Sequence, residues 1–352
     1  MTTPLPAIRP DRSADMDDFL QRIGWHGATR HFLAGDASFR RYERVENAGT
    51  VAVLMDAPPP WEDVRPFIAV TDMLAGCGVT VPSILARDEE GGFLLLEDMG
   101  DQSFTRLLKA HPERERAIYL AATEALVAIH TASRAHAATL SQVLKPYDTT
   151  VYLREAALLA EWFLPQIYGL ERAQALRGEY LDLWRDCLQQ AQPKQSCLVH
   201  RDYHADNLFW LEDRTGHGAV GMIDYQDALW GDPAYDLASL LEDARRDVSL
   251  STMADCFARF ATETGEESHA FAARYAIIAA QRNAKIIGIF ARLCLRDGKA
   301  HYLDYLPRVW AHFMHDLNHP ALAPLRGFIE QHVPLAWRGS FTPNLTIGGL
   351  PA

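Results

Sequence analysis

Two segments decide the fold of this chain: Leu198-Val-His-Arg-Asp-Tyr-His-Ala-Asp-Asn-Leu-Phe-Trp-Leu211 and Ala219-Val-Gly-Met-Ile-Asp-Tyr-Gln-Asp227. Short apolar runs at 209–211 and 220–223 flank the polar, glycine-bearing segment 212–218. This pattern predicts a β-hairpin. Antiparallel pairing would bring Asn207, just before the first strand, next to Asp224, just after the second, with Cβ atoms roughly 5 Å apart.

The ends of this hairpin carry side chains suited to phosphoryl transfer. The amide oxygen of Asn207 and the carboxylate of Asp224 are hard ligands of the kind that Mg²⁺ prefers. Asp202 lies on the entering loop and can face the same point. The spacing H-x-D-x-x-x-x-N, followed by an aspartate at a strand end, matches the kinase template. We therefore predict that Asp202 is the catalytic base and that Asn207 and Asp224 hold the metal.

Simpler explanations exist for each residue taken alone. Asp and Asn are common in turns, and H-x-D arises by chance in many chains. His200 and His204 have the spacing of zinc ligands on a helix, but the segment lacks an H-E-x-x-H glutamate and has the pattern of a loop. We therefore expect His200 to be a packed structural residue. The joint pattern, preceded by a β-rich region, is what favours phosphoryl transfer.

Composition excludes several classes of protein. The 352 residues are 48% hydrophobic, enough for a sizeable core, and the net charge of −12 argues against a nucleic-acid binder, which needs a basic face. The five scattered cysteines form no C-x-x-C pair, which predicts reduced thiols in a cytoplasmic protein. The sequence shows neither a signal-peptide core nor a segment able to span a bilayer. We expect a monomer without membrane or nucleic-acid partners.

Periodicity along the chain predicts two lobes. A short helix near 16–23, strands at 29–33, 39–45, 50–55 and 92–96, and a helix at 61–75 form the first part. Helices are expected at 113–133, 152–168, 176–190, 233–243, 253–264, 270–294 and 301–317, with a β patch within 197–227. We predict an α+β fold with a small β-rich N-lobe (residues 1–98) that binds nucleotide and a large, mainly helical C-lobe (residues 99–352) that carries the catalytic and substrate-binding residues.

The motif, the hairpin and the preceding β-rich part resemble the aminoglycoside phosphotransferase and choline-kinase-like family, a branch of the protein-kinase-like fold, over about residues 29–313. Three segments resemble the bacterial N-acetylmuramate/N-acetylglucosamine anomeric kinases: Gly35-Asp-Ala-Ser-Phe-Arg-Arg-Tyr42, Met55-Asp-Ala-Pro-Pro59, and the block from Asp224 to Val248. The resemblance implies phosphorylation of an amino sugar at its anomeric hydroxyl, with ATP and Mg²⁺, to give the α-1-phosphate in cell-wall recycling.

Nucleotide contacts follow from this resemblance. The loop around Gly35, Ala37 and Ser38 would cover the phosphates with backbone N–H groups. The segment after the strand at 93–96 resembles the hinge that reads adenine. Its contacts would be the carbonyl of Glu97 and the amide of Met99.

The chain departs from the family at one phosphate contact. Kinase-like folds carry a lysine on the third strand that pairs with the phosphates. Here residues 51–55 contain none, and the first lysine of the chain is Lys109. Arg40 or Arg41 is the expected substitute, because arginine binds phosphate bidentately. Alternatively, Mg²⁺ neutralises more of the charge. The role of Glu62, the expected partner of the missing lysine, stays open.

A sugar site needs carboxylates for the hydroxyls and an aromatic ring for the apolar face. Glu155 and Trp162 share one face of an expected helix, although a core tryptophan and a solvated glutamate explain them equally well. Asp227 and His204 are expected near the acceptor because they flank the catalytic residues; loop solvation is the alternative. Asp236 either braces the catalytic loop or stabilises a helix N-terminus.

Three functions remain open from the sequence. The favoured one is a kinase of the anomeric hydroxyl of N-acetylated amino sugars, in which Arg245 and Arg246 either hold a lactyl carboxylate or pair with nearby acids. The second is a kinase of another alcohol, such as an aminoglycoside, choline or homoserine; Asp227, Glu242 and Asp243 only hint at the acidic cluster that a cationic substrate needs. The third is a nucleotide-binding module without catalysis, supported by the missing lysine and opposed by the three retained catalytic positions.

Overall fold

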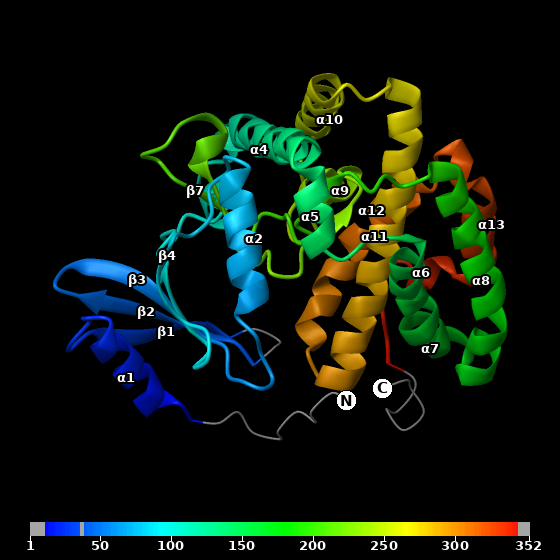
Figure 1. Ribbon diagram of the computed structural model, residues 1–352. Helices are drawn as coiled ribbons and strands as arrows, with labels where there is room; N and C mark the ends of the chain where they lie inside the picture. The colour runs from blue at the N-terminus through cyan, green and yellow to red at the C-terminus, as the bar shows by residue number, and fades with distance from the viewer. Residues whose placement is uncertain (1–10, 36–38, 344–352) are drawn as a thin grey trace.

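The computed structural model describes residues 11–35 and 39–343 of the chain. Figure 1 shows two parts: an antiparallel sheet flanked by helices, formed by the N-terminal residues, and a larger helical body formed by the rest. The predicted architecture, a β-rich N-lobe followed by a mainly helical C-lobe, is confirmed. The predicted boundary after residue 98 falls in the connection between the last strand of the sheet and the first helix of the C-lobe.

The N-lobe consists of α1 (Ser13–Arg22), β1 (Thr29–Gly35), β2 (Arg41–Asn47), β3 (Thr50–Asp56), α2 (Arg65–Gly76), β4 (Ile84–Asp88) and β5 (Phe93–Glu97). Its strands follow the order β1-β2-β3-β5-β4, and every neighbouring pair is antiparallel. Side chains alternate between the two faces of a sheet. Val45, Ala52 and Leu54 pack against α1, whereas Val53 and Met55 belong to the main core, which contains α2 and continues into the C-lobe.

Two details of the N-lobe differ from expectation. Helix α2 begins at Arg65, because the amides of Trp61 and Glu62 bond the carbonyl of Pro58 and form a turn first. Pro66 then occupies the first turn of the helix, where a missing N–H costs nothing. Strand β4 was not predicted, because it is short and lies at the edge of the sheet, where Leu85 is exposed.

The C-lobe is built around one long helix. The helices are α3 (Phe104–Ala110), α4 (Glu115–Ala135), α5 (Ala137–Val143), α6 (Thr149–Leu158), α7 (Leu164–Tyr168), α8 (Leu170–Ala191), α9 (Ala234–Leu241), α10 (Leu250–Thr264), α11 (Ser268–Asp297), α12 (Leu306–Asp316) and α13 (Ala323–His332). Helix α11 contacts α6, α8, α9 and α12, so it forms the centre of this lobe (Figure 1). Two small ribbons complete it: β6 (Cys197–Val199) with β9 (Leu229–Gly231), and β7 (Leu208–Trp210) with β8 (Val220–Met222).

The long helices lie where the periodicity predicted them, and the exceptions have local causes. The expected helix at 152–168 is divided into α6, a π-helical turn (Leu159–Phe163) and α7. At this turn α11 approaches closely: a Cβ atom on Gly288 would lie 2.3 Å from the carbonyl carbon of Leu158. Helices α3, α5 and α13 were not predicted, because short helices give little periodic signal.

Two further predictions concern the state of the cysteines and the absence of a membrane-spanning segment. All five cysteines lie in the described part of the chain, all are free, and all but Cys294 are buried. Within residues 11–35 and 39–343, none of the helices combines the length and the apolar character needed to cross a bilayer.

Candidate active site

The predicted hairpin forms and joins two of the predicted catalytic residues. Leu208 pairs with Met222 in the β7–β8 ribbon, and the amide of Ile223 donates to the carbonyl of Asn207 at 3.0 Å. The next residue, Asp224, has a left-handed backbone (φ 65°), which aspartate tolerates better than most residues. Its Oδ2 lies 3.4 Å from Nδ2 of Asn207. An amide and a carboxylate therefore meet where the two strand ends converge.

The third predicted catalytic residue, Asp202, lies on the loop that enters β7, and its side chain is exposed. Its carbonyl accepts hydrogen bonds from Nδ2 of Asn207 at 3.0 Å and from the amide of His204 at 3.0 Å. Its own amide donates to Nδ1 of His200 at 3.3 Å. His200 is fully buried, and burial lowers its pKa to about 4, so its ring stays neutral. The prediction of a packed structural histidine is confirmed.

Asp236, in the first turn of α9, holds this loop from behind. Its Oδ2 accepts the amide of His200 at 2.6 Å and its Oδ1 accepts the amide of Arg201 at 2.9 Å. Arg201 has a left-handed backbone (φ 77°), an unfavourable conformation for a non-glycine residue that these bonds maintain. Burial raises the pKa of Asp236 to about 7, although the two amide donors act in the opposite direction. Of its two predicted roles, the brace is confirmed.

Asp243 supports the same loop further along. It is fully buried, and its oxygens accept the amides of Ala205 at 3.0 Å and Arg245 at 2.8 Å. Glu242 is also buried and bonds Asn283 and Tyr275. These two acids therefore serve the interior of the C-lobe, and the idea that they form a subsite for a cationic substrate is wrong.

His204 lies behind the side chain of Asn207. Its side chain is only 6% exposed, and its Nε2 lies 3.5 Å from Nδ2 of Asn207. Burial is the main reason that its pKa falls well below the ordinary value, so the ring is neutral and can accept from the amide. Its predicted contact with substrate stays a prediction that this burial does not favour; the geometry suits a role in orienting Asn207.

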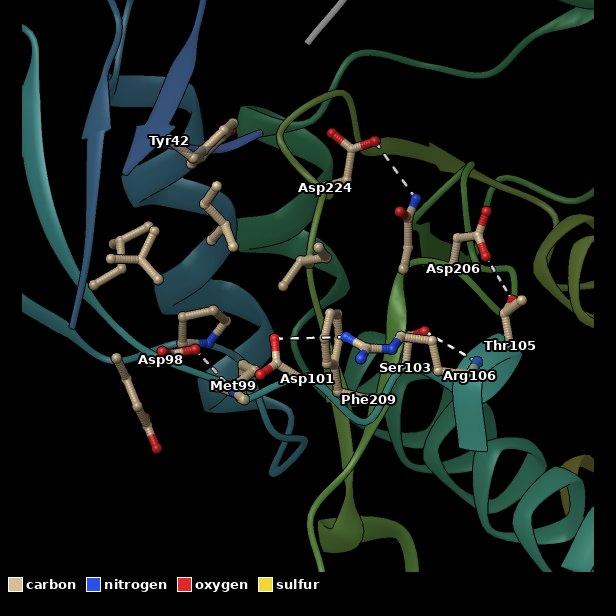
Figure 2. A pocket seen from close by; sticks show the side chains of 18 of the residues that line it. Tyr42, Asp98, Met99, Asp101, Ser103, Thr105, Arg106, Asp206, Phe209 and Asp224 are labelled. Atoms are coloured by element: carbon tan, nitrogen blue, oxygen red, sulfur yellow. Dashed lines mark hydrogen bonds and ion pairs between the residues drawn. The ribbon is translucent and has the colours of Figure 1, made fainter. Parts of the chain in front are cut away.

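A cavity of about 560 Å³ lies between the lobes and ends at these residues. In Figure 2, Met99 and Asp98 lie at one end of it and Asp224 at the other. Apolar side chains line both sides, and the predicted hinge residue Glu97 and the amide of Asn207 also border it. Several residues that line the cavity were not predicted as site residues: Tyr42, Val53, Asp98, Asp101, Arg106, Phe209 and Ile223.

The predicted nucleotide contacts are only partly described. Gly35 ends β1 and pairs with Arg41, whereas Ala37 and Ser38 lie outside the described residues. The carboxylate of Glu97 bonds Ser83 and Arg214, and the contact of its backbone carbonyl with a base stays a prediction.

The two candidate arginines have different partners. Arg41 pairs with Glu43 and lies over the ring of Phe32 at 5.7 Å. Arg40 lies just before β2, two positions before Tyr42, which lines the cavity; if the alternation of β2 continued to residue 40, Arg40 would share that face. Its Nε lies 4.0 Å from Oε2 of Glu62, whose Oε1 accepts the amide of residue 39 at 2.9 Å. The structure therefore favours Arg40 over Arg41.

The two residues predicted to stack on and bond the sugar are packed inside the C-lobe. Trp162 lies in the π-helical turn and is 3% exposed. Glu155 is buried, and its oxygens contact Arg201 at 2.6 Å, Lys285 at 3.1 Å and the hydroxyl of Tyr147. Their sugar contacts stay predictions that the packing does not favour.

Asp227 differs from these two, because its side chain is exposed and its carbonyl lies 3.4 Å from Nη1 of Arg201. It therefore lies beside the loop that carries Asp202, and its contact with the acceptor stays a prediction. The arginines considered for a lactyl carboxylate pair with acids instead: Arg245 with Asp206, and Arg246 with Glu115, each at 2.8 Å.

Lys285 is a residue near the site that the sequence reasoning missed. It comes from α11, 83 positions after Asp202, and its side chain is largely buried between Glu155 and Tyr235. The signal was present, because Lys285 is one of the polar residues that interrupt the aliphatic stretch at 276–289. A lysine inside a core helix is rarely buried without a charged partner, so its presence there indicates a buried ion pair.

Comparisons with known proteins agree with the geometry. Residues 29–282 match the phosphotransferase enzyme family. A protein of Caulobacter vibrioides named N-acetylmuramate/N-acetylglucosamine kinase is 34% identical over 362 aligned positions, covering 94% of this chain and 99% of that protein. A protein of Pseudomonas aeruginosa with the same name is 38% identical, covering 78% of this chain and 80% of that protein.

Solved structures support the same assignment at the level of the fold. Choline kinase LicA from Streptococcus pneumoniae has a TM-score of 0.59 at 12% identity, covering 88% of this chain and 98% of that chain. An ADP-bound aminoglycoside phosphotransferase also has a TM-score of 0.59, at 14% identity, covering 89% and 99%. With its motifs, its fold and relatives aligned along most of its length, the chain belongs to the phosphotransferase enzyme family.

Proposed function

We propose that this protein uses ATP to phosphorylate the anomeric hydroxyl of N-acetylmuramate and N-acetylglucosamine, giving the α-1-phosphate. The observation that carries the proposal is the meeting of Asn207 and Asp224 at the polar end of the interlobe cavity, with Asp202 exposed on the same loop. The names of the relatives supply the substrate class. Free, mostly buried cysteines and ATP as donor fit a cytoplasmic enzyme.

The nucleotide fits the cavity by size and by chemistry. A volume of about 560 Å³ is in the range of small-molecule sites. Its apolar part, between Val53 on the N-lobe side and Phe209 and Ile223 on the C-lobe side, suits a purine ring. The backbone of Glu97 and Met99 would bond the base. This orientation directs the phosphates toward Asp224.

The residues at the polar end fit Mg²⁺. Nδ2 of Asn207 donates toward the carbonyl of Asp202, which leaves the amide oxygen as a ligand. The carboxylate of Asp224 supplies the second, and both are hard oxygen donors. When bound, the ion would neutralise charge on the β- and γ-phosphates. We propose that Arg40, held by Glu62, supplies the remaining positive charge.

The catalytic step assigned to this chain's own residues is proton transfer from the sugar. The carboxylate of Asp202 would accept a hydrogen bond from the anomeric hydroxyl and take its proton as the phosphoryl group arrives. A base acting this late needs no raised pKa. Positioning matters more, because a well-oriented acceptor supplies much of the rate. The bonds from Asp236 and Asp243 fix the loop before any substrate binds.

The test is turnover with each amino sugar and Mg-ATP, followed by phosphorus NMR of the product. We expect ADP and a sugar 1-phosphate, and we expect Asp202→Asn to lower kcat at least about a thousandfold by removing the base and its charge. Asp213→Asn, on the exposed hairpin loop, is the matched control and should keep wild-type activity. Turnover only with other alcohols would refute the substrate, and an Asp202→Asn variant with wild-type kcat would refute the mechanism.

A further inference from the structure

A buried group of charges lies beside the proposed base and takes no part in the mechanism above. Glu155 of α6 pairs through one oxygen with two cations: Nη2 of Arg201 at 2.6 Å and Nζ of Lys285 at 3.1 Å. Its other oxygen accepts the hydroxyl of Tyr147, and Lys285 also bonds the hydroxyl of Tyr235 at 3.1 Å. Three parts of the fold, α6, the catalytic loop and α11, therefore place these charges together.

All three groups are ionised. Burial favours the neutral acid at Glu155, yet Lys285 and Arg201 hold its pKa below the ordinary value. Burial opposes the charge on Lys285 too, but Tyr235 and Glu155 keep its pKa above the ordinary value. Glu155 thus cancels one of the two positive charges. The positive charge that remains lies close to the carboxylate of Asp202.

The acceptor lies within the electrostatic range of this group. Arg201 directly precedes Asp202, and the carboxylate of Asp202 contributes to the raised pKa of both cations. The side chains are also shielded from water: the exposed fraction is 8% for Glu155 and 12% for Lys285. Charges in such surroundings act over longer distances than charges in water.

The two proposed substrates differ in charge. N-acetylglucosamine is neutral, whereas N-acetylmuramate carries a carboxylate on a lactyl ether, attached to the ring carbon next but one to the reacting carbon. A net positive charge beside Asp202 would therefore favour the acid, and a net negative charge would favour the neutral sugar. An enzyme that uses both needs this position to be balanced.

Building on the proposed function, we propose that Glu155 is a specificity-determining residue: its carboxylate offsets the Arg201–Lys285 pair and thereby sets the preference between a neutral and an anionic sugar. It does so through charge, without touching the sugar. Lys285 is its counterpart with the opposite sign. The experiment measures kcat/KM for both sugars and compares the ratio of the acid to the neutral sugar among variants.

In Glu155→Gln, we expect the ratio to rise about tenfold, the effect of one unit charge at roughly 10 Å in a partly buried site. In Lys285→Met, we expect it to fall by a similar factor. The double variant restores the balance and should return the ratio to within threefold of the wild type. Glu161→Gln, which removes an ion-paired carboxylate from the neighbouring turn, is the control and should leave the ratio unchanged.

The outcomes separate this inference from the proposed function. If the wild type acts on neither sugar, the proposed function fails. If it acts on both and the variants lower both rates at a constant ratio, Glu155 has only a structural role and this inference fails. If Glu155→Gln does not fold, Lys285→Met decides alone: a fall in the ratio supports the inference, and an unchanged or raised ratio overturns it.

Discussion

Replacing Arg40 and Arg41 one at a time tests which arginine binds the phosphates in place of the missing strand lysine. The two are adjacent in the sequence and chemically identical, so any difference arises from the surroundings in which each lies. Arg40 lies beside Glu62, two positions before Tyr42, which lines the cavity, and Arg41 pairs with Glu43. We expect Arg40→Met to weaken the use of ATP and Arg41→Met to leave it almost unchanged.

The structure sets the magnitude of each effect. The Arg40 side chain is 11% exposed, so its contact with a phosphate would be a shielded, charge-assisted one. Such contacts contribute about 1.5–3 kcal/mol, which corresponds to a loss of roughly ten- to hundredfold in kcat/KM for ATP. Arg41 is 35% exposed, and without it Glu43 still pairs with Arg30. Its loss should cost less than about 1 kcal/mol of stability.

The assay is initial rate against ATP concentration at saturating sugar, with thermal unfolding measured on the same samples. Glu62→Gln is an informative third variant: the glutamine can still accept the amide of residue 39, but it no longer holds the guanidinium of Arg40 by charge. We expect an intermediate rise in KM for ATP. The reasoning is refuted if Arg41→Met loses as much activity as Arg40→Met, or if Arg40→Met stays within threefold of the wild type.

Two further predictions concern stability. Gly288→Ala would place a Cβ atom 2.3 Å from the carbonyl carbon of Leu158, so we expect urea denaturation to show a loss of about 3 kcal/mol in the free energy of unfolding. Gly178→Ala, at a helical site with open space, is the control and should be neutral or slightly stabilising. Equal effects of the two substitutions would contradict this prediction. Burial, together with the charge of Glu242, raises the pKa of Asp316 well above its ordinary value. The folded state therefore favours the protonated acid, and the free energy of unfolding falls as pH rises above about 4 toward that raised pKa. Asp316→Asn mimics the protonated form, so unfolding experiments across this pH range should show the variant gaining stability relative to the wild type; a constant difference would contradict the argument.

The sequence predicted those parts of the site that depend on local pairing. Asn207 and Asp224 meet because a hairpin connects them, and both the hairpin and its turn are readable from the order of apolar and polar residues. Asp202 is five positions from Asn207, so the loop between them can place it in only a few ways. The long helices were predicted for a similar reason, since their apolar faces repeat along the chain.

Contacts between distant segments could not be predicted in this way. Whether Arg40 or Arg41 faces the cavity depends on the register of β2 against its neighbours, and a shift of one residue exchanges their faces. Glu155 and Trp162 share a helical face, but periodicity does not say which element covers that face. Here α11 covers it in part and brings Lys285 to Glu155 from 130 positions away. The sequence predicted the helix but left open whether its residues face the core or the sugar, and the packing favours the core.

The segments that carry the proposed catalytic residues are held in place from both lobes. From the C-lobe, Asp236 bonds the backbone of the loop that carries Asp202. From the N-lobe, α2 packs on the residue after Asp224: the ring of Tyr225 stacks on Phe67 with centroids 5.0 Å apart, and its hydroxyl lies 2.9 Å from that of Thr71. Displacing Tyr225 would therefore break a buried hydrogen bond and an aromatic contact, at a cost of about 2 kcal/mol or more. Substrate binding energy is then not spent on assembling the site, and it remains available for the transition state.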